Sequence, residues 1–383
     1  MYFDHNATTP LAPEVADAFS RALRDVPGNA SSTHIAGQTA RQALEQARLM
    51  VARTLKCTPK EVVFTSGGTE SDNLAILGMV RQAPGTRKHV VTTAIEHPAV
   101  LESVRQLERE GVEITVTGAS VNDIEKALRA ETVLVSVMHA NNETGAIQPI
   151  REIAQIVRER RAAGQPVYLH SDGVQALGKS NVDVNELGVD LYSISAHKIY
   201  GPKGVGALVV RKDTPLAAIQ FGGRHERGRR AGTENVPGAV AFATACELLQ
   251  KHPPQELAVL RDRFEQQILT ALDDIEINSA EAARVPNTSN VLFRGISGEA
   301  LLIALDMAGF AVSTGAACSS GSIEPSHVLL AIGLTVAEAR SCVRFSFGRT
   351  NTLDDIGRLA EAVIRTVRRL RKTNDRKAQL VTH

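Results

Sequence analysis

The sequence predicts an α/β protein with two domains: a large one built on a seven-stranded, mostly parallel sheet, and a smaller α+β domain. The chain has 383 residues, which at about 150 residues per domain suggests two domains. Short apolar runs alternate with stretches of helical spacing between residues 62 and 210, a pattern typical of strands linked by helices. After about residue 250 this alternation ends and the strand signals become scattered.

Seven short apolar runs, most of them rich in β-branched residues, are the predicted strands of the large domain. They are residues 62–64, 90–92, 112–116, 133–138, 167–169, 191–194 and 205–210. Helical spacing occurs over residues 36–54 and again after Pro149. Alternation of this kind implies a mostly parallel sheet with helices on both faces.

The second domain is predicted to contain residues 253–383 together with residues 1–12, which leaves residues 13–252 for the large domain. Its strand signals lie at 290–293 and 343–347, before a final helix with acidic residues at its start and basic ones at its end. The basic end is either a binding patch or a solvated helix terminus. The helix dipole and the near-neutral net charge favour the second interpretation.

Composition excludes several classes of protein. Apolar residues make up 43% of the chain, which excludes a wholly disordered protein, and a net charge of +1 excludes a globally basic nucleic-acid binder. Four cysteines are too few for a disulfide framework, and no two have metal-finger spacing. The sequence has no secretory signal and no apolar run approaching the roughly 20 residues of a membrane helix. We therefore expect a cytoplasmic protein without a metal, a nucleic-acid partner or membrane attachment.

The segment after the first strand, residues 65–73, combines two glycines with hydroxyl and acidic side chains. Glycines let the backbone approach an anion, and the following helix offers N–H groups and the positive end of its dipole. The segment predicts either a phosphate cradle, to which Thr69 could add a hydroxyl, or an ordinary capped glycine turn. Taken alone, His97 after the second strand could equally be structural, and Asn141 and Asn142 after the fourth could form an Asx turn.

Asp172 and Lys198 follow the fifth and sixth strands and are 26 residues apart, about one strand–helix–strand unit. Ligands of open parallel sheets bind beyond the carboxyl ends of the strands, so the two side chains could meet there as a simple ion pair. Together with a phosphate cradle, Asp172 and Lys198 predict a site for pyridoxal phosphate. This cofactor needs a phosphate site, a carboxylate for its ring nitrogen and a lysine amine.

At this point the chain resembles the cysteine desulfurases of the class V, fold-type-I aminotransferase superfamily, in particular the nitrogen-fixation and iron–sulfur-assembly branch. The motifs that carry the resemblance span nearly the whole chain: residues 4–10, 65–73, 96–100, 141–145, 195–198, 201–204, 229–235, 315–321, 324–329 and 344–349. Departures are small. Ala30 stands where the family has proline, Gly173 follows the aspartate, and the cysteine loop reads Ser-Thr-Gly-Ala-Ala-Cys.

The resemblance implies roles for the residues around the cofactor. Lys198 would carry pyridoxal phosphate covalently, Asp172 would pair with its ring nitrogen, and Gln175 would hydrogen-bond its ring hydroxyl. His97 would stack on the ring and move protons. The phosphate would be bound by Gly68, Thr69, Ser195 and His197, with Thr233 reaching the phosphate of the partner subunit in a homodimer.

The resemblance also implies the substrate and the nucleophile. Asn142, which is also a cofactor-binding residue, and Arg344 would hold L-cysteine, with Arg344 as a bidentate clamp on its carboxylate. Cys318 would attack the substrate sulfur as a thiolate, leaving a persulfide and releasing L-alanine. The persulfide would then supply a sulfur-acceptor protein such as an iron–sulfur scaffold. Small residues around Cys318 suggest a mobile segment, whereas Cys57, Cys246 and Cys342 are interpreted as structural thiols.

Three alternatives remain. An aminotransferase on the same scaffold would use Lys198 and Asp172 but would not need Cys318. A selenocysteine lyase of the related branch would be recognised by comparing its turnover of selenocysteine with that of cysteine. A catalytically silent docking protein would have no need for Lys198, Asp172, His97 and Cys318 together.

Overall fold

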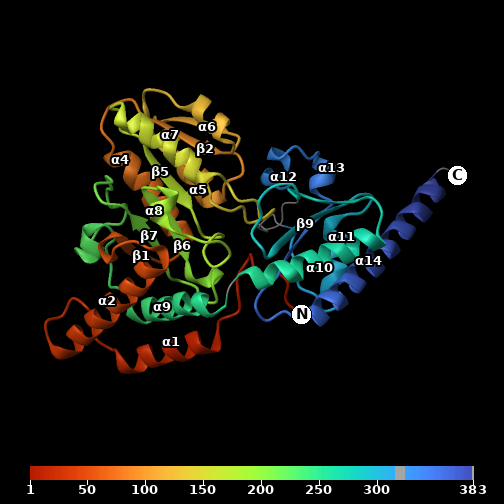
Figure 1. Cartoon of the computed structure of the whole chain (residues 1–383), viewed down its shortest axis with the longest axis horizontal. Helices are drawn as coiled ribbons and strands as arrows, with labels where there is room; N and C mark the ends of the chain where they lie inside the picture. Colours follow the sequence, from red (N-terminus) through yellow and green to blue (C-terminus); the bar gives the residue numbers. More distant parts are fainter. Residues whose placement is uncertain (253, 315–323, 382–383) are drawn as a thin grey trace. The chain divides into compact units, whose positions relative to one another are not determined.

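The computed structural model describes residues 1–252, 254–314 and 324–381, which form two compact units (Figure 1). The larger unit contains Thr9–Ala140 and Gln148–His252. The smaller unit contains Met1–Thr8, Asn141–Ile147 and Pro253–His383. A short segment from the middle of the sequence thus packs with the N-terminal and C-terminal parts of the chain.

The larger unit is built on a seven-stranded sheet with the order β1-β7-β6-β5-β4-β2-β3. Its strands are β1 (Val62–Thr65), β2 (His89–Thr93), β3 (Glu113–Thr117), β4 (Thr132–Ser136), β5 (Tyr168–Asp172), β6 (Leu191–Ser195) and β7 (Gly206–Val210). Strand β7 runs antiparallel to both of its neighbours, β1 and β6, and the other pairs are parallel. The predicted seven-stranded, mostly parallel sheet is confirmed.

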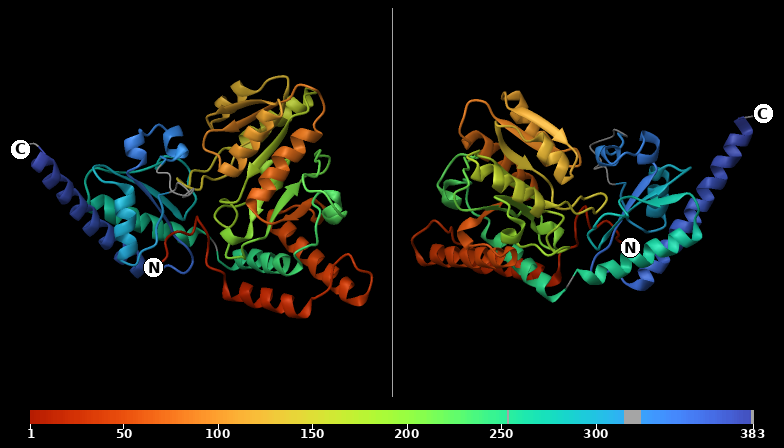
Figure 2. Two further views of the ribbon diagram at one scale, coloured as in Figure 1. Left: turned by 180° about the vertical axis from the view of Figure 1, so that it is seen from behind. Right: turned by 45° about the horizontal axis from the view of Figure 1, so that its top comes forward.

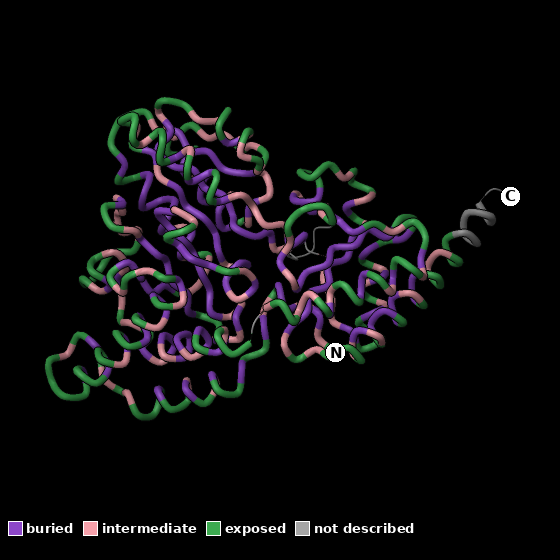
Figure 3. Tube along the Cα trace, viewed as in Figure 1, coloured by how far each residue is buried: buried purple, intermediate pink, exposed green. Residues whose placement is uncertain are grey.

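Helices cover the sheet and bury most of its strands. The helices of this unit are α1 (Pro13–Asp25), α2 (Ile35–Leu55), α3 (Gly68–Asn73), α4 (Met79–Gln82), α5 (Pro98–Arg109), α6 (Val121–Ala127), α7 (Ile150–Ala162), α8 (Val184–Leu187) and α9 (Val236–Lys251). Every residue of β1, β2, β4, β6 and β7 is buried, whereas the edge strand β3 is partly exposed (Figure 3). This burial on both faces explains why the strands read as short apolar runs.

Helix α9 packs beside α1 and α2, and Figure 2 shows the three helices together along one side of the unit. The small side chains of α9, such as Ala239 and Ala241, are fully or almost fully buried, and so is Cys246. Small residues let helix backbones approach closely. The interpretation of Cys246 as a structural thiol therefore fits its position in the core.

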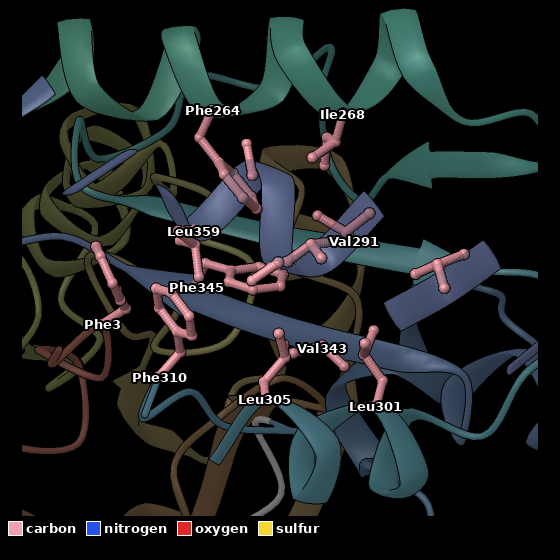
Figure 4. Close-up of a cluster of buried hydrophobic side chains, with 14 of the residues drawn as sticks. Phe3, Phe264, Ile268, Val291, Leu301, Leu305, Phe310, Val343, Phe345 and Leu359 are labelled. Carbon is pink, nitrogen blue, oxygen red and sulfur yellow. The ribbon is translucent and has the colours of Figure 1, made fainter. Parts of the chain in front are cut away.

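The smaller unit has a three-stranded antiparallel sheet of order β10-β9-β8. Its elements are α10 (Gln255–Ala271), β8 (Ile275–Ile277), β9 (Thr288–Phe293), α11 (Gly298–Met307), α12 (His327–Ala331), α13 (Val336–Ala339), β10 (Cys342–Ser346) and α14 (Leu353–Val381). Figure 4 shows side chains of α10 and α11 pointing toward the strands that carry Val291, Val343 and Phe345. The N-terminal segment adds Phe3 to this core.

The final helix begins with Asp354 and Asp355 in its first turn, as predicted. Two of its basic side chains bond the backbone of their own unit: Arg368 donates to the carbonyl of Ala271 at 2.9 Å, and Arg371 donates to that of Asp273 at 2.8 Å. Among the helices that the structure describes, none is both long and apolar enough to cross a membrane.

Candidate functional site

The turn after β1 leaves an open space in front of a buried hydroxyl group. Gly67 has φ +155°, and a β-carbon built there would lie 3.8 Å from Ser195 Oγ. That oxygen is buried and has no hydrogen-bond partner among the described residues. A β-carbon at Gly68 would come within 2.8 Å of Val174 Cγ2. The two glycines therefore bring the backbone close to Ser195 and leave its hydroxyl available.

The same turn is fixed by a side-chain network. Glu70 accepts hydrogen bonds from the Ser66 N–H at 2.7 Å and from Arg230 Nε at 2.8 Å. Although burial opposes it, these hydrogen bonds hold the pKa of Glu70 below its ordinary value. Thr65 Oγ1 and Ser71 Oγ are 2.8 Å apart across the turn. The start of α3 is thus held rigidly, while Thr69 is exposed.

Asp172 and Lys198 are brought to the same edge of the sheet. Strands β5 and β6 are parallel neighbours with Asp172 in register with Ser193, and Lys198 ends the short 3-10 helix Ala196–Lys198 that follows β6. Asp172 Oδ1 accepts a hydrogen bond from the Val174 N–H at 2.9 Å. Burial, and secondarily the nearby Asp72 carboxyl, raise the pKa of Asp172 to about 7.

His97 and His197 flank this edge in different electrostatic settings. The Nδ1 atom of His97 accepts the Ala99 N–H at 3.1 Å, so the neutral ring carries its proton on Nε2. Burial raises the pKa of Asp172, and the positive charge of a protonated His97 acts against this rise. Burial, followed by the charges of Lys198, Lys203 and Lys179, lowers the pKa of His197 to about 4. His197 is therefore neutral near pH 7.

Gln175, the predicted partner of the ring hydroxyl, is buried and accepts a hydrogen bond from Lys179 Nζ. Lys179 is itself buried. Because the amide oxygen already accepts from a cation, the amide nitrogen is the end of Gln175 that can donate to a further acceptor.

A group of buried polar side chains beneath Asp172 was not predicted from the sequence. Burial raises the pKa of Asp72 to about 7 and that of Glu96 to about 8. Asp72 Oδ1 has no hydrogen-bond partner among the described residues and lies 3.5 Å from His170 Nε2. Burial lowers the pKa of His170 to about 4. Only the packing of α3 against the sheet places Asp72 near Asp172, so no sequence pattern pointed to it.

In the smaller unit the two predicted substrate-binding residues lie together. Arg344 on β10 donates from Nη1 to the carbonyl oxygen of Asn142 at 3.0 Å. Its Nη2 donates to Asp4 Oδ1 at 2.6 Å. Glu143, next to Asn142, is buried and accepts a hydrogen bond from Ser326 Oγ at 2.6 Å. The involvement of Asp4 and Glu143 was not predicted.

One predicted residue stands apart from these clusters, and another has no described position. Thr233 is exposed in the turn between Gly232 and α9. Cys318 lies outside the described residues. Among the described residues, no group of three histidine, cysteine, aspartate or glutamate side chains is placed to hold a metal ion.

Comparison with known proteins agrees with this geometry. Residues 1–359 match the family described as "Aminotransferase class-V". "Cysteine desulfurase IscS" of Dictyoglomus turgidum is 43% identical over 380 residues, covering 97% of this chain and 95% of that protein. "Cysteine desulfurase 1" of Trichormus variabilis is 44% identical over 382 residues, covering 97% and 94%.

Two solved structures are also similar over most of their length. A "NIFS-LIKE PROTEIN" has a TM-score of 0.89 and 33% identity, covering 97% of this chain and 100% of the other. The structure described as "SspA in complex with cysteine" has a TM-score of 0.80 and 36% identity, covering 90% and 98%.

The chain therefore belongs to the class V aminotransferase family. Within that family its enzyme class is that of the cysteine desulfurases, and its cofactor is pyridoxal phosphate. The residues of the larger unit fit this cofactor. The unpartnered Ser195 hydroxyl beside Gly67 suits a phosphate, Asp172 suits a ring nitrogen, and Lys198 has the kind of amine that covalent attachment of the cofactor needs.

Proposed function

We propose that this enzyme transfers the sulfur of L-cysteine to its own Cys318 and releases L-alanine. The observation that carries the proposal is the placing of Asp172 and Lys198 at the ends of neighbouring parallel strands, on the same rim as the Gly67–Ser195 space. When bound, pyridoxal phosphate stabilises negative charge that develops at the α-carbon of an amino acid attached to it.

The larger unit would hold the cofactor and move protons. Lys198 would carry the cofactor, and its amine would be the group that takes a proton from the substrate. A cationic ring nitrogen would favour the ionised form of Asp172, whose pKa is otherwise raised by burial. Gly68, Thr69, Ser195 and neutral His197 would bind the phosphate. His97, whose Nδ1 accepts the Ala99 N–H, would turn its Nε2 N–H toward the reacting atoms.

The smaller unit would hold the substrate. Arg344 would bind the carboxylate of cysteine and Asn142 would contact the substrate and cofactor. The thiolate of Cys318 would attack the substrate sulfur, forming an S–S bond while the carbon–sulfur bond breaks. The electron pair left on the carbon skeleton takes up a proton, so that L-cysteine and the Cys318 thiol become L-alanine and a Cys318 persulfide.

We further propose that the enzyme is a cytoplasmic homodimer in which Thr233 reaches the phosphate of the neighbouring site. The exposed position of Thr233 supports this role. The persulfide would be passed to a sulfur-acceptor protein, with an iron–sulfur scaffold as the expected class.

The proposal is tested with purified wild-type, Cys318→Ala and Lys198→Ala proteins incubated with L-cysteine. Wild type should form equimolar alanine and bound sulfur, located on Cys318 by peptide mass measurement. Cys318→Ala should keep the visible absorption of the bound cofactor but lose at least about 99% of alanine formation, because the thiol that would accept the sulfur is removed. Lys198→Ala should lose the visible band on dialysis.

Cys57→Ala is the matched control, because Cys57 is only partly buried and lies in the turn after α2. It should retain wild-type turnover. Full alanine production by Cys318→Ala would contradict the nucleophile assignment. Accumulation of a keto acid instead of alanine would identify an aminotransferase.

A further inference from the structure

The guanidinium group of Arg344 is held by two acceptors that come from different parts of the smaller unit. Its Nη2 donates to Asp4 Oδ1 at 2.6 Å, and its Nη1 donates to the Asn142 carbonyl at 3.0 Å. Arg344 is buried, with a side chain 4% exposed, and that of Asp4 is 19% exposed. This pair is therefore shielded from water far more than an ordinary surface ion pair.

The backbone fixes where the Asp4 carboxylate lies. The N-terminal segment runs parallel to β10, with Asp4 paired to Ser346. The Ser346 N–H donates to the Phe3 carbonyl at 2.8 Å, and the His5 N–H donates to the Ser346 carbonyl at 3.3 Å. Arg344 and Ser346 are two residues apart on one strand and share a face of the sheet. Asp4, paired beside Ser346, reaches Arg344 on that face.

Further contacts hold the segment in place. The hydroxyl of Tyr2 donates to the carbonyls of Asp4 and Thr8, at 2.9 Å each. Asn6 Nδ2 donates to the Asn142 carbonyl at 3.0 Å and to Thr288 Oγ1 at 2.8 Å. The segment thus supplies the Asp4 carboxylate and also helps to position the Asn142 carbonyl that holds the other end of the guanidinium group.

One of the donors of Arg344 that these two hydrogen bonds do not use is equally informative. A guanidinium group carries five N–H donors in one plane. Its Nε is buried and has no hydrogen-bond partner among the described residues. A buried donor left unpaired costs free energy unless a ligand satisfies it. With both terminal nitrogens already tied, the orientation of the plane is set before any ligand arrives, and Nε remains for an incoming acceptor.

We propose that Asp4 is a positioning residue that fixes Arg344 so that its unpaired Nε edge receives the α-carboxylate of the amino-acid substrate. This inference rests on the proposed function, in which Arg344 is the carboxylate clamp, and adds the residue that sets its geometry. Asp4 also compensates the charge of Arg344 before substrate binds. Recognition then depends on directed hydrogen bonds to a planar carboxylate more than on attraction of any anion.

The test compares Asp4→Ala, Asp4→Asn and wild type in two measurements. The first is steady-state alanine formation from L-cysteine. The second is the calorimetric Kd of 3-mercaptopropionate, which has the carboxylate and thiol but no amine, for the cofactor-loaded enzyme. Asp4→Ala should raise both KM and Kd at least about tenfold, the effect of losing one well-directed charge-assisted hydrogen bond. Its kcat should stay within about threefold, because the cofactor-binding residues are untouched.

Asp4→Asn keeps an acceptor oxygen toward Nη2, so it should restore KM and Kd to within about threefold of wild type. Asp306→Asn is the matched control, because Asp306 is an exposed acid of the same unit; it should change neither constant. A KM and Kd within twofold of wild type in Asp4→Ala would overturn the proposal. So would a fall in kcat with unchanged Kd, or an Asp4→Asn variant as impaired as Asp4→Ala.

A different result would contradict the proposed function itself: wild type would form no alanine from cysteine, whatever its affinity for 3-mercaptopropionate.

Discussion

Replacing Asp72 by asparagine should stabilise the larger unit in a strongly pH-dependent way. Burial raises the pKa of Asp72 from 3.8 to about 7, despite a hydrogen bond with Ser193 that lowers it. Between these two values the unfolded chain is ionised at Asp72 while the folded protein keeps its proton. Each pH unit of rise therefore favours unfolding by about 1.4 kcal/mol, and about 4 kcal/mol of stability is lost in total. Asparagine has no proton to lose, so the variant escapes this loss.

The assay is urea unfolding of cofactor-free protein at about pH 5 and about pH 8.5. Between about pH 5 and the folded pKa of Asp72, an interval of roughly two pH units, only the unfolded chain is ionised at this residue. The free energy of unfolding of Asp72→Asn minus that of wild type should be about 3 kcal/mol larger at the higher pH, so that the variant is the more stable protein there. His170 does not titrate in this window, because burial lowers its pKa to about 4. The charge of Asp72 also raises the pKa of Asp172. Its removal lowers that pKa, which adds to the stabilisation of the variant at the higher pH.

Asp17→Asn, which removes an exposed carboxylate of α1, is the matched control and should show no such pH dependence. An equal stability change for Asp72→Asn at both pH values would refute the reasoning. It would mean that Asp72 is already ionised in the folded protein at about pH 5.

Two further predictions follow from buried side chains. Glu226→Gln should destabilise the protein by about 3–5 kcal/mol in urea unfolding, because it removes the buried carboxylate that pairs with Arg48 and leaves Arg48 only the half-exposed carboxylate of Glu45. The wild-type Arg48–Glu226 pair is 2.7 Å apart with side chains 3% and 2% exposed. Glu102→Gln, which removes an exposed helical pair, should cost under about 1 kcal/mol, and equal losses in the two variants would contradict the argument. Burial raises the pKa of Cys57, Cys246 and Cys342 to about 12, so these thiols should react slowly with iodoacetamide at about pH 8 and Cys318 should be modified first. Intact mass measures the labelling. Equally rapid labelling of Cys318→Ala would show that another thiol reacts.

The sheet of the larger unit could be predicted because burial on both faces leaves a local mark on the sequence. Each strand is a short run, most of the runs are rich in β-branched residues, and the predicted run at 205–210 begins within one residue of β7. The antiparallel direction of β7 has no corresponding sequence pattern, since an antiparallel strand buried on both faces has the same composition as a parallel one. The packing of residues 141–147 with the smaller unit could not be predicted from the sequence either, because it depends on contacts with residues far away in the sequence.

The same distinction applies to the site. Asp172 and Lys198 were predictable as neighbours because a strand–helix–strand unit fixes their spacing, and the observed register places their strands side by side. Asp72 and Glu96 were not, because a buried acid looks like a capping or surface residue until its surroundings are known. Their raised pKa values come from burial, which is a property of the folded protein rather than of their sequence neighbours.

Asp4 and Arg344 show most clearly which contacts the sequence cannot predict, since these hydrogen-bonded residues lie 340 positions apart in the chain. Both belong to motifs that the sequence made visible, yet neither motif indicates that it pairs with the other. The pairing follows from the parallel bridge between Asp4 and Ser346, which exists only once the N-terminal segment has joined β10. A clamp built in this way cannot be oriented until the smaller unit has assembled around it. If Arg344 has the proposed role, formation of the smaller unit would therefore also prepare the group that binds the carboxylate.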